Sequence, residues 1–225
     1  MKKLTWLFVF TVIVALGFDT AFASEACPDC GSVSGTISVW KTKVITEGSK
    51  SGKDVVVYLE DKNGKVYPPP ETIPEMDQQG LVFIPHVMAV QKGMTVRFLN
   101  NDSVDHNVYF LFEKTGETLD IGTYPQGVHV DYKFEDTGSV IVLCKLHLEM
   151  AAYILVLDNP YYTLSDIDAD SQTAQYSIEN VPPGDYILKA WHKKLQMKGE
   201  LAEISIESGK VTNFDITITK KKYAK

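Results

Sequence analysis

The sequence contains a single arginine, Arg97, and its 22 basic residues are outnumbered by 29 acidic ones. Proteins that bind nucleic acids usually carry a basic patch that contacts the phosphates. Because arginine is so scarce and the formal net charge is −7, we do not expect this chain to bind nucleic acid. An acidic surface instead favours association with a basic partner protein.

Long hydrophobic runs are also lacking, except near the N-terminus. There, two lysines precede an apolar run over residues 4–18, and the small-residue sequence Ala-Phe-Ala follows at residues 21–23. This order is typical of a secretory signal peptide, and the run is shorter than the roughly 20 residues that span a bilayer. We therefore predict a signal peptide over residues 1–23 and a periplasmic or otherwise exported protein without stable membrane insertion. An N-terminal membrane anchor is the alternative.

Cysteine is scarce too, with three in the chain. Cys27 and Cys30 lie in the predicted N-terminal tail, residues 24–32, where an oxidising compartment favours a disulfide between them. A metal-handling tail is the alternative. Covalent haem attachment is excluded, because Gly31 stands where that motif requires histidine. Cys144 is left over, and an odd thiol in an exported protein must be protected, paired between chains or bound to a metal.

No segment carries the pattern of a helix longer than one turn. From Gly35 onward the sequence instead alternates short apolar runs with turn signals, which predicts an all-β fold of sandwich or barrel type. Pro85 interrupts one of these runs and indicates an edge or a bulge there. The expected strands cover residues 36–40, 55–59, 81–90, 94–99, 106–112, 127–134, 139–143, 151–157, 175–178, 185–191, 201–206 and 211–219.

Between two expected strands, Cys144, His147 and Met150 follow one another at intervals of three residues. Two histidines, one cysteine and a distant methionine form electron-transfer copper sites, so this segment supplies three of four ligands. His106 opens a strand after a polar loop and is the candidate for the fourth. These four ligands would leave no open position for a substrate, so we predict an electron carrier and not an enzyme. Asn107 is placed to tie the two ligand loops together.

Residues 70–158 contain the motifs Phe83-x-Pro85, Gly93-Met-Thr-Val-Arg-Phe98, Asn101-x5-Asn107 and Cys144-x2-His147-x2-Met150. With these motifs the segment resembles the cupredoxins, the plastocyanin, pseudoazurin and amicyanin family. The resemblance implies a Greek-key β-sandwich with one copper per chain in a type 1 (blue) centre, which cycles between Cu(I) and Cu(II) and exchanges single electrons with redox partner proteins. Many members have proline after the ligand histidine, where this chain has Leu148.

Residues 160–222 contain the motif Tyr176-x-Ile178-x2-Val181-Pro182-Pro183-Gly184-x-Tyr186-x-Leu188. With this motif the segment resembles a carboxypeptidase-regulatory-like (transthyretin-like) β-sandwich. The first two strands of that family are missing from this segment, but candidates for them occur within residues 33–66. We therefore predict a second, smaller β-sandwich that is split between residues 33–66 and 160–222, with the cupredoxin domain inserted. A serial arrangement of the domains is the alternative.

The remaining histidines have weaker indications. We expect structural or surface positions for His86 and His129, and a surface position for His192. A second functional hypothesis is periplasmic copper sequestration or delivery, with Cys27, Cys30 and His86 as auxiliary ligands. A third, a structural or adhesive module, leaves the spacing of the predicted copper ligands unexplained.

Overall fold

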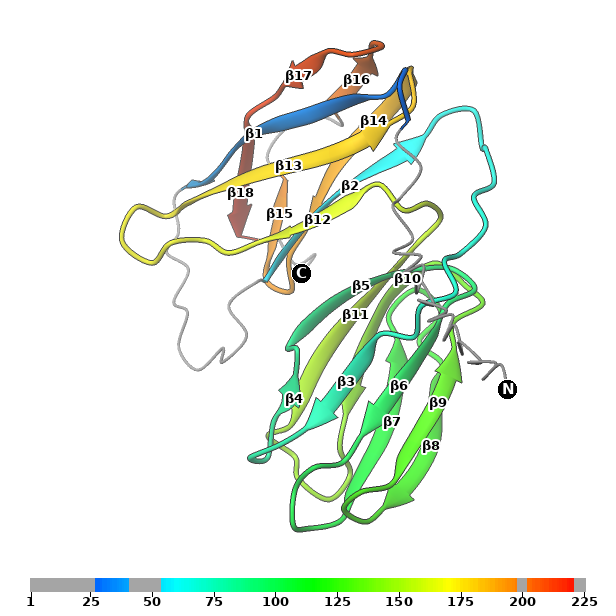
Figure 1. The fold of residues 1–225 in the computed structure, drawn as a ribbon. Helices are drawn as coiled ribbons and strands as arrows, with labels where there is room; N and C mark the ends of the chain where they lie inside the picture. Colours follow the sequence, from blue (N-terminus) through cyan, green and yellow to red (C-terminus); the bar gives the residue numbers. More distant parts are fainter. Residues whose placement is uncertain (1–26, 41–53, 198–201, 221–225) are drawn as a thin grey trace, which may run out of the picture.

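The computed structural model describes residues 27–40, 54–197 and 202–220 (Figure 1). Within these residues the chain forms eighteen strands and no helix, so the predicted all-β class is confirmed. The predicted signal peptide, residues 1–23, lies outside the described residues. No helix in the described part of the chain is long and apolar enough to cross a membrane.

Strands from both ends of the chain form one nine-stranded sheet, which we call the flanking unit. Two of its strands come before the middle of the chain and seven come after it. Its strands are β1 (Gly31–Trp40), β2 (Val55–Asp61), β12 (Tyr162–Ser165), β13 (Thr173–Val181), β14 (Gly184–Trp191), β15 (Leu195–Met197), β16 (Ala202–Ile206), β17 (Val211–Asn213) and β18 (Ile216–Lys220).

The middle of the chain forms two further sheets, which we call the central unit. A five-stranded sheet in the order β5-β11-β10-β7-β8 faces a four-stranded sheet in the order β4-β3-β6-β9. Its strands are β3 (Glu75–Gln78), β4 (Phe83–Ile84), β5 (Val87–Gln91), β6 (Thr95–Leu99), β7 (His106–Phe112), β8 (Thr118–Tyr124), β9 (His129–Lys133), β10 (Gly138–Leu143) and β11 (Ala151–Leu157).

The pairing of β1 and β2 shows where the N-terminal strands belong. β1 lies antiparallel to β13 and parallel to β17 and β18. β2 lies between β12 and β14, antiparallel to both. In Figure 1 these strands make up the upper part of the molecule, and the central unit lies below them. Strands on either side of residues 75–157 therefore complete one sheet.

Each unit has its own buried core. In the flanking unit, β13 and β16 alternate buried and exposed residues, as strands with one face on a core do. In the central unit, Phe110 of β7 packs against Phe98 of β6 and against Phe134, with ring centroids 5.3 and 5.5 Å apart. These aromatic contacts join the two sheets of the central unit across their shared core.

A third buried cluster joins the two units. Leu155 and Leu157 of β11 and Val87 and Ala89 of β5 pack with Val56, which comes from β2 of the flanking unit. The alternate residues of β11 face the core of the central unit instead. Because β11 is covered on both faces, its sequence is a continuous apolar run and does not alternate.

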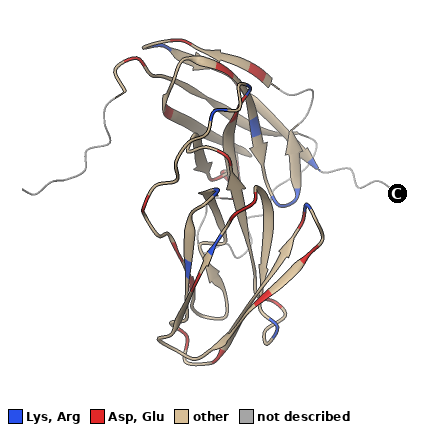
Figure 2. Cartoon of the chain, turned by 90° about the vertical axis from the view of Figure 1, so that its right-hand side faces the viewer, with Lys and Arg blue, Asp and Glu red and all other residues tan. Residues whose placement is uncertain are grey.

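Charged residues do not concentrate in one part of the structure. Figure 2 shows acidic and basic positions interspersed along both units. Arg97 of β6 donates two hydrogen bonds of 2.9 Å to Asp131 of β9. The Arg97 guanidinium therefore holds the pKa of that carboxyl below its usual range.

Several strands differ from those expected. The expected strand over residues 81–90 is two strands, β4 and β5, which belong to different sheets. The chain crosses between the sheets at Pro85, whose peptide bond is cis. The expected strand over residues 211–219 is likewise two strands, and β3, β8, β12 and β15 were not expected. These four unexpected strands lack a strong apolar alternation, so pairing with neighbouring strands decides their conformation.

The expected surface position of His192 is wrong, because only 3% of this residue is exposed. Its Nδ1 accepts a hydrogen bond from the Lys194 amide in the turn that follows β14. His129 is exposed, and His86 is partly buried with its Nε2 2.6 Å from the Lys193 Nζ of the flanking unit. Burial lowers the pKa of His86, and the Lys193 ammonium lowers it further.

The packing of β1 into the core of the flanking unit can be tested at Ile37. This residue is fully buried on β1, opposite Ala174 and Ile216. Ile37→Ala is expected to lower the free energy of unfolding by about 2–5 kcal/mol, because the lost side chain leaves a cavity. Urea unfolding measures this change. Val211→Ala, at an exposed position of β17, is the control and should change it by less than about 0.5 kcal/mol. Equal effects would contradict the packing of β1.

Candidate metal centre

The predicted ligands lie at one end of the central unit because of the way three strands pair. β10 and β11 are antiparallel, with Leu143 opposite Ala151, so residues 144–150 form the tip of a hairpin. β7 is antiparallel to β10 on its other side, with Tyr109 opposite Leu143. The start of β7, at His106, therefore lies beside the end of β10.

Three of the four predicted ligands converge in the structure. His106 Nδ1 lies 3.9 Å from Cys144 Sγ, and His147 Nδ1 lies 3.7 Å from the same sulfur. The two Nδ1 atoms are 3.0 Å apart. Cys144 and His106 are buried, whereas His147 is partly exposed. Among the described residues, no other group of three His, Cys, Asp or Glu side chains comes together in this way.

The fourth predicted ligand, Met150, is 1% exposed and packs in the same core cluster as Cys144. The Met150 amide donates a 3.0 Å hydrogen bond to the His147 carbonyl, which closes a turn at the tip of the hairpin. Leu148, within this turn, is 87% exposed. The loop thus buries its sulfur-bearing side chains and exposes Leu148.

Asn107 connects the two loops that carry the ligands. Its Oδ1 accepts a 3.2 Å hydrogen bond from the backbone amide of Lys145. The backbone amide of Asn107 donates a 3.4 Å hydrogen bond to Cys144 Sγ. Its Nδ2 donates to Asp120 Oδ1 at 2.8 Å and to the Gly122 carbonyl at 3.0 Å. One buried side chain therefore joins the start of β7, the loop after β10 and β8.

A charged pair borders this network. Lys145 Nζ lies 2.7 Å from Asp120 Oδ2 and 4.7 Å from the centre of the Tyr109 ring. The hydrogen bond from Lys145, followed by the one from Asn107, holds the pKa of Asp120 below its usual range. The sequence did not indicate Asp120, because it lies on β8, a strand that was not expected.

On the opposite side of His106, Asp102 Oδ2 lies 2.8 Å from Nε2 of the ring. Burial raises the pKa of the Asp102 carboxyl, but the amides of Leu81 and Gly80 and then the His106 ring outweigh it, so the pKa lies below its usual range. Sequence reasoning missed Asp102. Its place four residues before His106 was the available signal, but the amides that hold it come from a distant loop.

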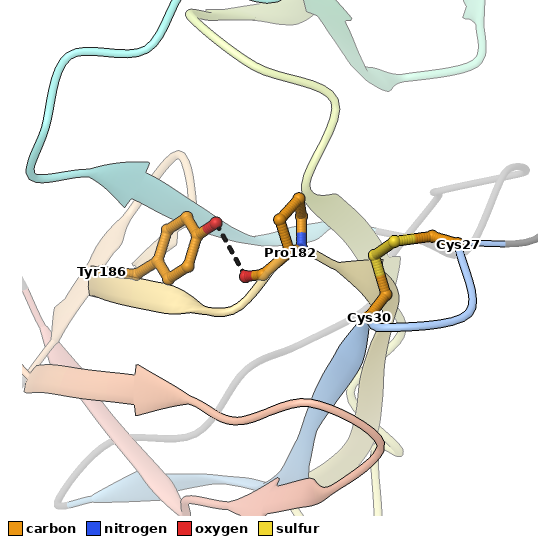
Figure 3. Close-up of a disulfide and its surroundings, with 4 residues drawn as sticks. All are labelled: Cys27, Cys30, Pro182 and Tyr186. Atoms are coloured by element: carbon orange, nitrogen blue, oxygen red, sulfur yellow. Dashed lines mark hydrogen bonds between the residues drawn. A yellow bond between two sulfur atoms is a disulfide. The ribbon is translucent and has the colours of Figure 1, made fainter.

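Cys27 and Cys30 lie directly before β1 and are joined by a disulfide (Figure 3). Figure 3 also shows Pro182 and Tyr186, which belong to the motif over residues 176–188. The Tyr186 hydroxyl donates a 3.0 Å hydrogen bond to the Pro182 carbonyl. In this state neither sulfur is a thiol. Cys144 is the remaining free cysteine.

The donor set of the cluster fits copper better than a hard cation. One cysteine sulfur and two imidazole nitrogens are soft or borderline ligands, which suit copper, whereas magnesium and calcium take oxygen ligands. Residues 71–157 match the sequence model of the copper binding proteins, plastocyanin/azurin family. This segment is therefore similar to the plastocyanin/azurin copper-binding proteins. Its cofactor is copper.

Solved structures that are similar to the chain include an amicyanin mutant in its Cu(I) form, at 18% identity and a TM-score of 0.36. That match covers 44% of this chain and 98% of the amicyanin chain. A purple cupredoxin from Nitrosopumilus maritimus is 19% identical with a TM-score of 0.33, over 37% of this chain and 98% of that one. No curated protein sequence matches the chain.

The role of Asn107 in joining the loops can be tested in the copper-free protein. Asn107→Ala is expected to lower the free energy of unfolding by about 1–3 kcal/mol, because buried polar groups lose their partners. Hydrogen exchange at the Lys145 amide should also become faster. Asn101→Ala, which removes an exposed hydrogen bond to Asp77, is the control with an expected change below about 0.5 kcal/mol. Unchanged exchange at Lys145 would refute this role.

Proposed function

We propose that this chain is an exported electron carrier in which His106, Cys144, His147 and Met150 form a type 1 (blue) copper centre. One observation carries the proposal. Within a copper-binding domain, one cysteine sulfur and two histidine nitrogens lie within 4.8 Å of one another. This set, completed by a methionine, is the one that electron-transfer copper sites use.

Bound copper would supply one-electron chemistry by alternating between Cu(I) and Cu(II). The chain would contribute ligands that move little between the two states. His106 and Cys144 are buried, and Asn107 connects the loops that carry them. Sulfur ligands favour Cu(I), whereas imidazole suits both oxidation states. A fixed set of both kinds is therefore a compromise that makes electron exchange fast.

His147 is the route by which electrons would enter and leave. It is the one partly exposed member of the converging cluster. Leu146 and Leu148 beside it are 52% and 87% exposed, so a partner protein would meet an apolar surface there. A redox partner would dock at this surface if its own shape and charge fit it.

We also propose that the flanking unit is a single carboxypeptidase-regulatory-like domain, formed by residues 33–66 and 160–222, that carries the copper domain as an insertion. The pairing of β1 with β13 and β18 supports this division. β11 leads from the Met150 end toward the flanking unit, and its seven residues at about 3.3 Å each span roughly 23 Å. The flanking unit would thus leave the ligand end free.

No observation favours copper sequestration or delivery over electron transfer. That hypothesis needs Cys27 and Cys30 as ligands, and the two are joined in a disulfide. The disulfide supports export to an oxidising compartment, together with the signal-peptide pattern over residues 1–23.

Copper titration with visible and electron-paramagnetic spectroscopy tests this proposal. One copper per chain is expected, with an intense thiolate-to-copper band in the oxidised protein. Cys144→Ser should abolish this band because it removes the thiolate. The matched control is the double substitution of Cys27 and Cys30 by serine, which should leave the band and the stoichiometry unchanged. A second copper that depends on Cys27 and Cys30 would instead support sequestration.

The axial role of Met150 is tested by Met150→Leu, which keeps the apolar volume and removes the thioether. Copper and the visible band should be retained, because the other three ligands remain. The reduction potential should change, because the axial ligand tunes it. A potential equal to that of the unmodified protein would show that Met150 serves only as a core residue.

A further inference from the structure

His106 is held on both sides of its ring. The ring is fully buried, and its Nδ1 faces Cys144 Sγ and His147 Nδ1. On the far side, its Nε2 lies 2.8 Å from the Asp102 carboxylate. The resemblance to cupredoxins indicated the ligand, but not this carboxylate.

The carboxylate is itself fixed by the backbone of another loop. The Gly80 amide donates to Asp102 Oδ1 at 2.6 Å, and the Leu81 amide donates to Oδ2 at 2.9 Å. The Asp102 amide donates to the side chain of Asn100, which is 1% exposed and also donates to the Tyr124 carbonyl. Asp102 is therefore oriented by contacts that do not involve His106.

This geometry settles which nitrogen of His106 carries hydrogen. An ionised carboxylate only accepts hydrogen bonds, so Nε2 must donate to Asp102. A neutral imidazole has one protonated nitrogen, so Nδ1 keeps a free lone pair directed at Cys144 and His147. A metal ligand must offer such a lone pair. The charged Asp102 thus prepares His106 for a metal before the metal arrives.

We propose that Asp102 is a positioning residue for the copper centre, which holds His106 in the Nε2–H form and lowers the reduction potential of the bound copper. The inference rests on the proposed function, because it takes His106 as a copper ligand. Carboxylates that accept the second N–H of a ligand histidine make the ring more basic. A more basic ligand and a nearby negative charge both favour Cu(II), which carries one more positive charge than Cu(I).

A purely structural reading of Asp102 is that it only ties the Gly80–Leu81 turn to the loop before His106. That role would affect stability alone. It would change neither the hydrogen position on His106 nor the reduction potential, so these two quantities distinguish the readings.

The first experiment uses the copper-free, unmodified protein. Nitrogen-15 spectra of the His106 ring are expected to show hydrogen on Nε2 and a lone pair on Nδ1. Hydrogen on Nδ1 would overturn the proposal. Because no copper is present, this result does not depend on the proposed function. A protein whose oxidised form lacks the thiolate band would instead refute the proposed function, and with it the effect on the potential.

The second experiment is a redox titration of the copper-loaded protein. Asp102→Asn is expected to favour Cu(I) by about tenfold in the equilibrium with a redox mediator, about 59 mV for one electron. The matched control is Asp105→Asn, which removes the same charge from an exposed residue next to His106. If the two variants shift the potential equally, Asp102 acts only through its negative charge and not through its contact with His106, and the proposal is wrong.

Asp102→Glu covers the case in which Asp102→Asn fails to fold or to bind copper. The longer side chain keeps the charge and the ability to accept from Nε2. A folded, copper-loaded Asp102→Glu protein whose potential lies within about 59 mV of that of the unmodified protein supports the proposal. The proposal is wrong if the Asp102→Glu protein folds but does not bind copper. It is also wrong if Asp102→Glu shifts the reduction potential by about 59 mV or more, which is tenfold in the equilibrium with the mediator.

Discussion

The register between β7, β10 and β11 is the constraint on which the candidate metal centre depends. Leu143 lies opposite Tyr109 on one side and opposite Ala151 on the other. Because the side chains of a strand alternate between faces, a shift of one residue would turn His106 away from Cys144. The packing of Phe110 against Phe98 and Phe134 opposes such a shift. The core of the central unit therefore holds the proposed ligands in place without a contribution from a metal.

The same strands connect the centre to the rest of the chain. β11 starts directly after Met150. Near its other end, its residues Leu155 and Leu157 pack in a buried cluster with Val56, which belongs to the flanking unit. At this boundary the Asn159 side chain also donates a 2.8 Å hydrogen bond to the Leu59 carbonyl. Apolar burial and a buried hydrogen bond together resist rotation of one unit against the other. The flanking unit thus has a defined orientation relative to the ligand end.

The sequence was most informative where local spacing decides the structure. The intervals between Cys144, His147 and Met150 predicted the loop, and the polar loop before His106 predicted the start of β7, at the residue where the strand begins. Asp102 and Asp120 were missed because their roles depend on Gly80, Leu81 and β8, which only the folded sheets bring near. The surface position predicted for His192 was wrong for the same reason. Its burial depends on how the chain turns after β14 and not on an alternating pattern in the sequence. Long-range contacts leave no periodic signal in the sequence.

Leu148 shows how the centre can be held without the proline that many cupredoxins have there. A proline would restrict the backbone of the residue before it, here His147. In this chain hydrogen bonds supply the restriction, since the Met150 amide bonds to the His147 carbonyl and the Lys145 amide bonds to Asn107. Both bonds lie within or beside the ligand loop, whereas Leu148 is exposed. The loop geometry is therefore fixed by hydrogen bonds and does not depend on the residue at position 148.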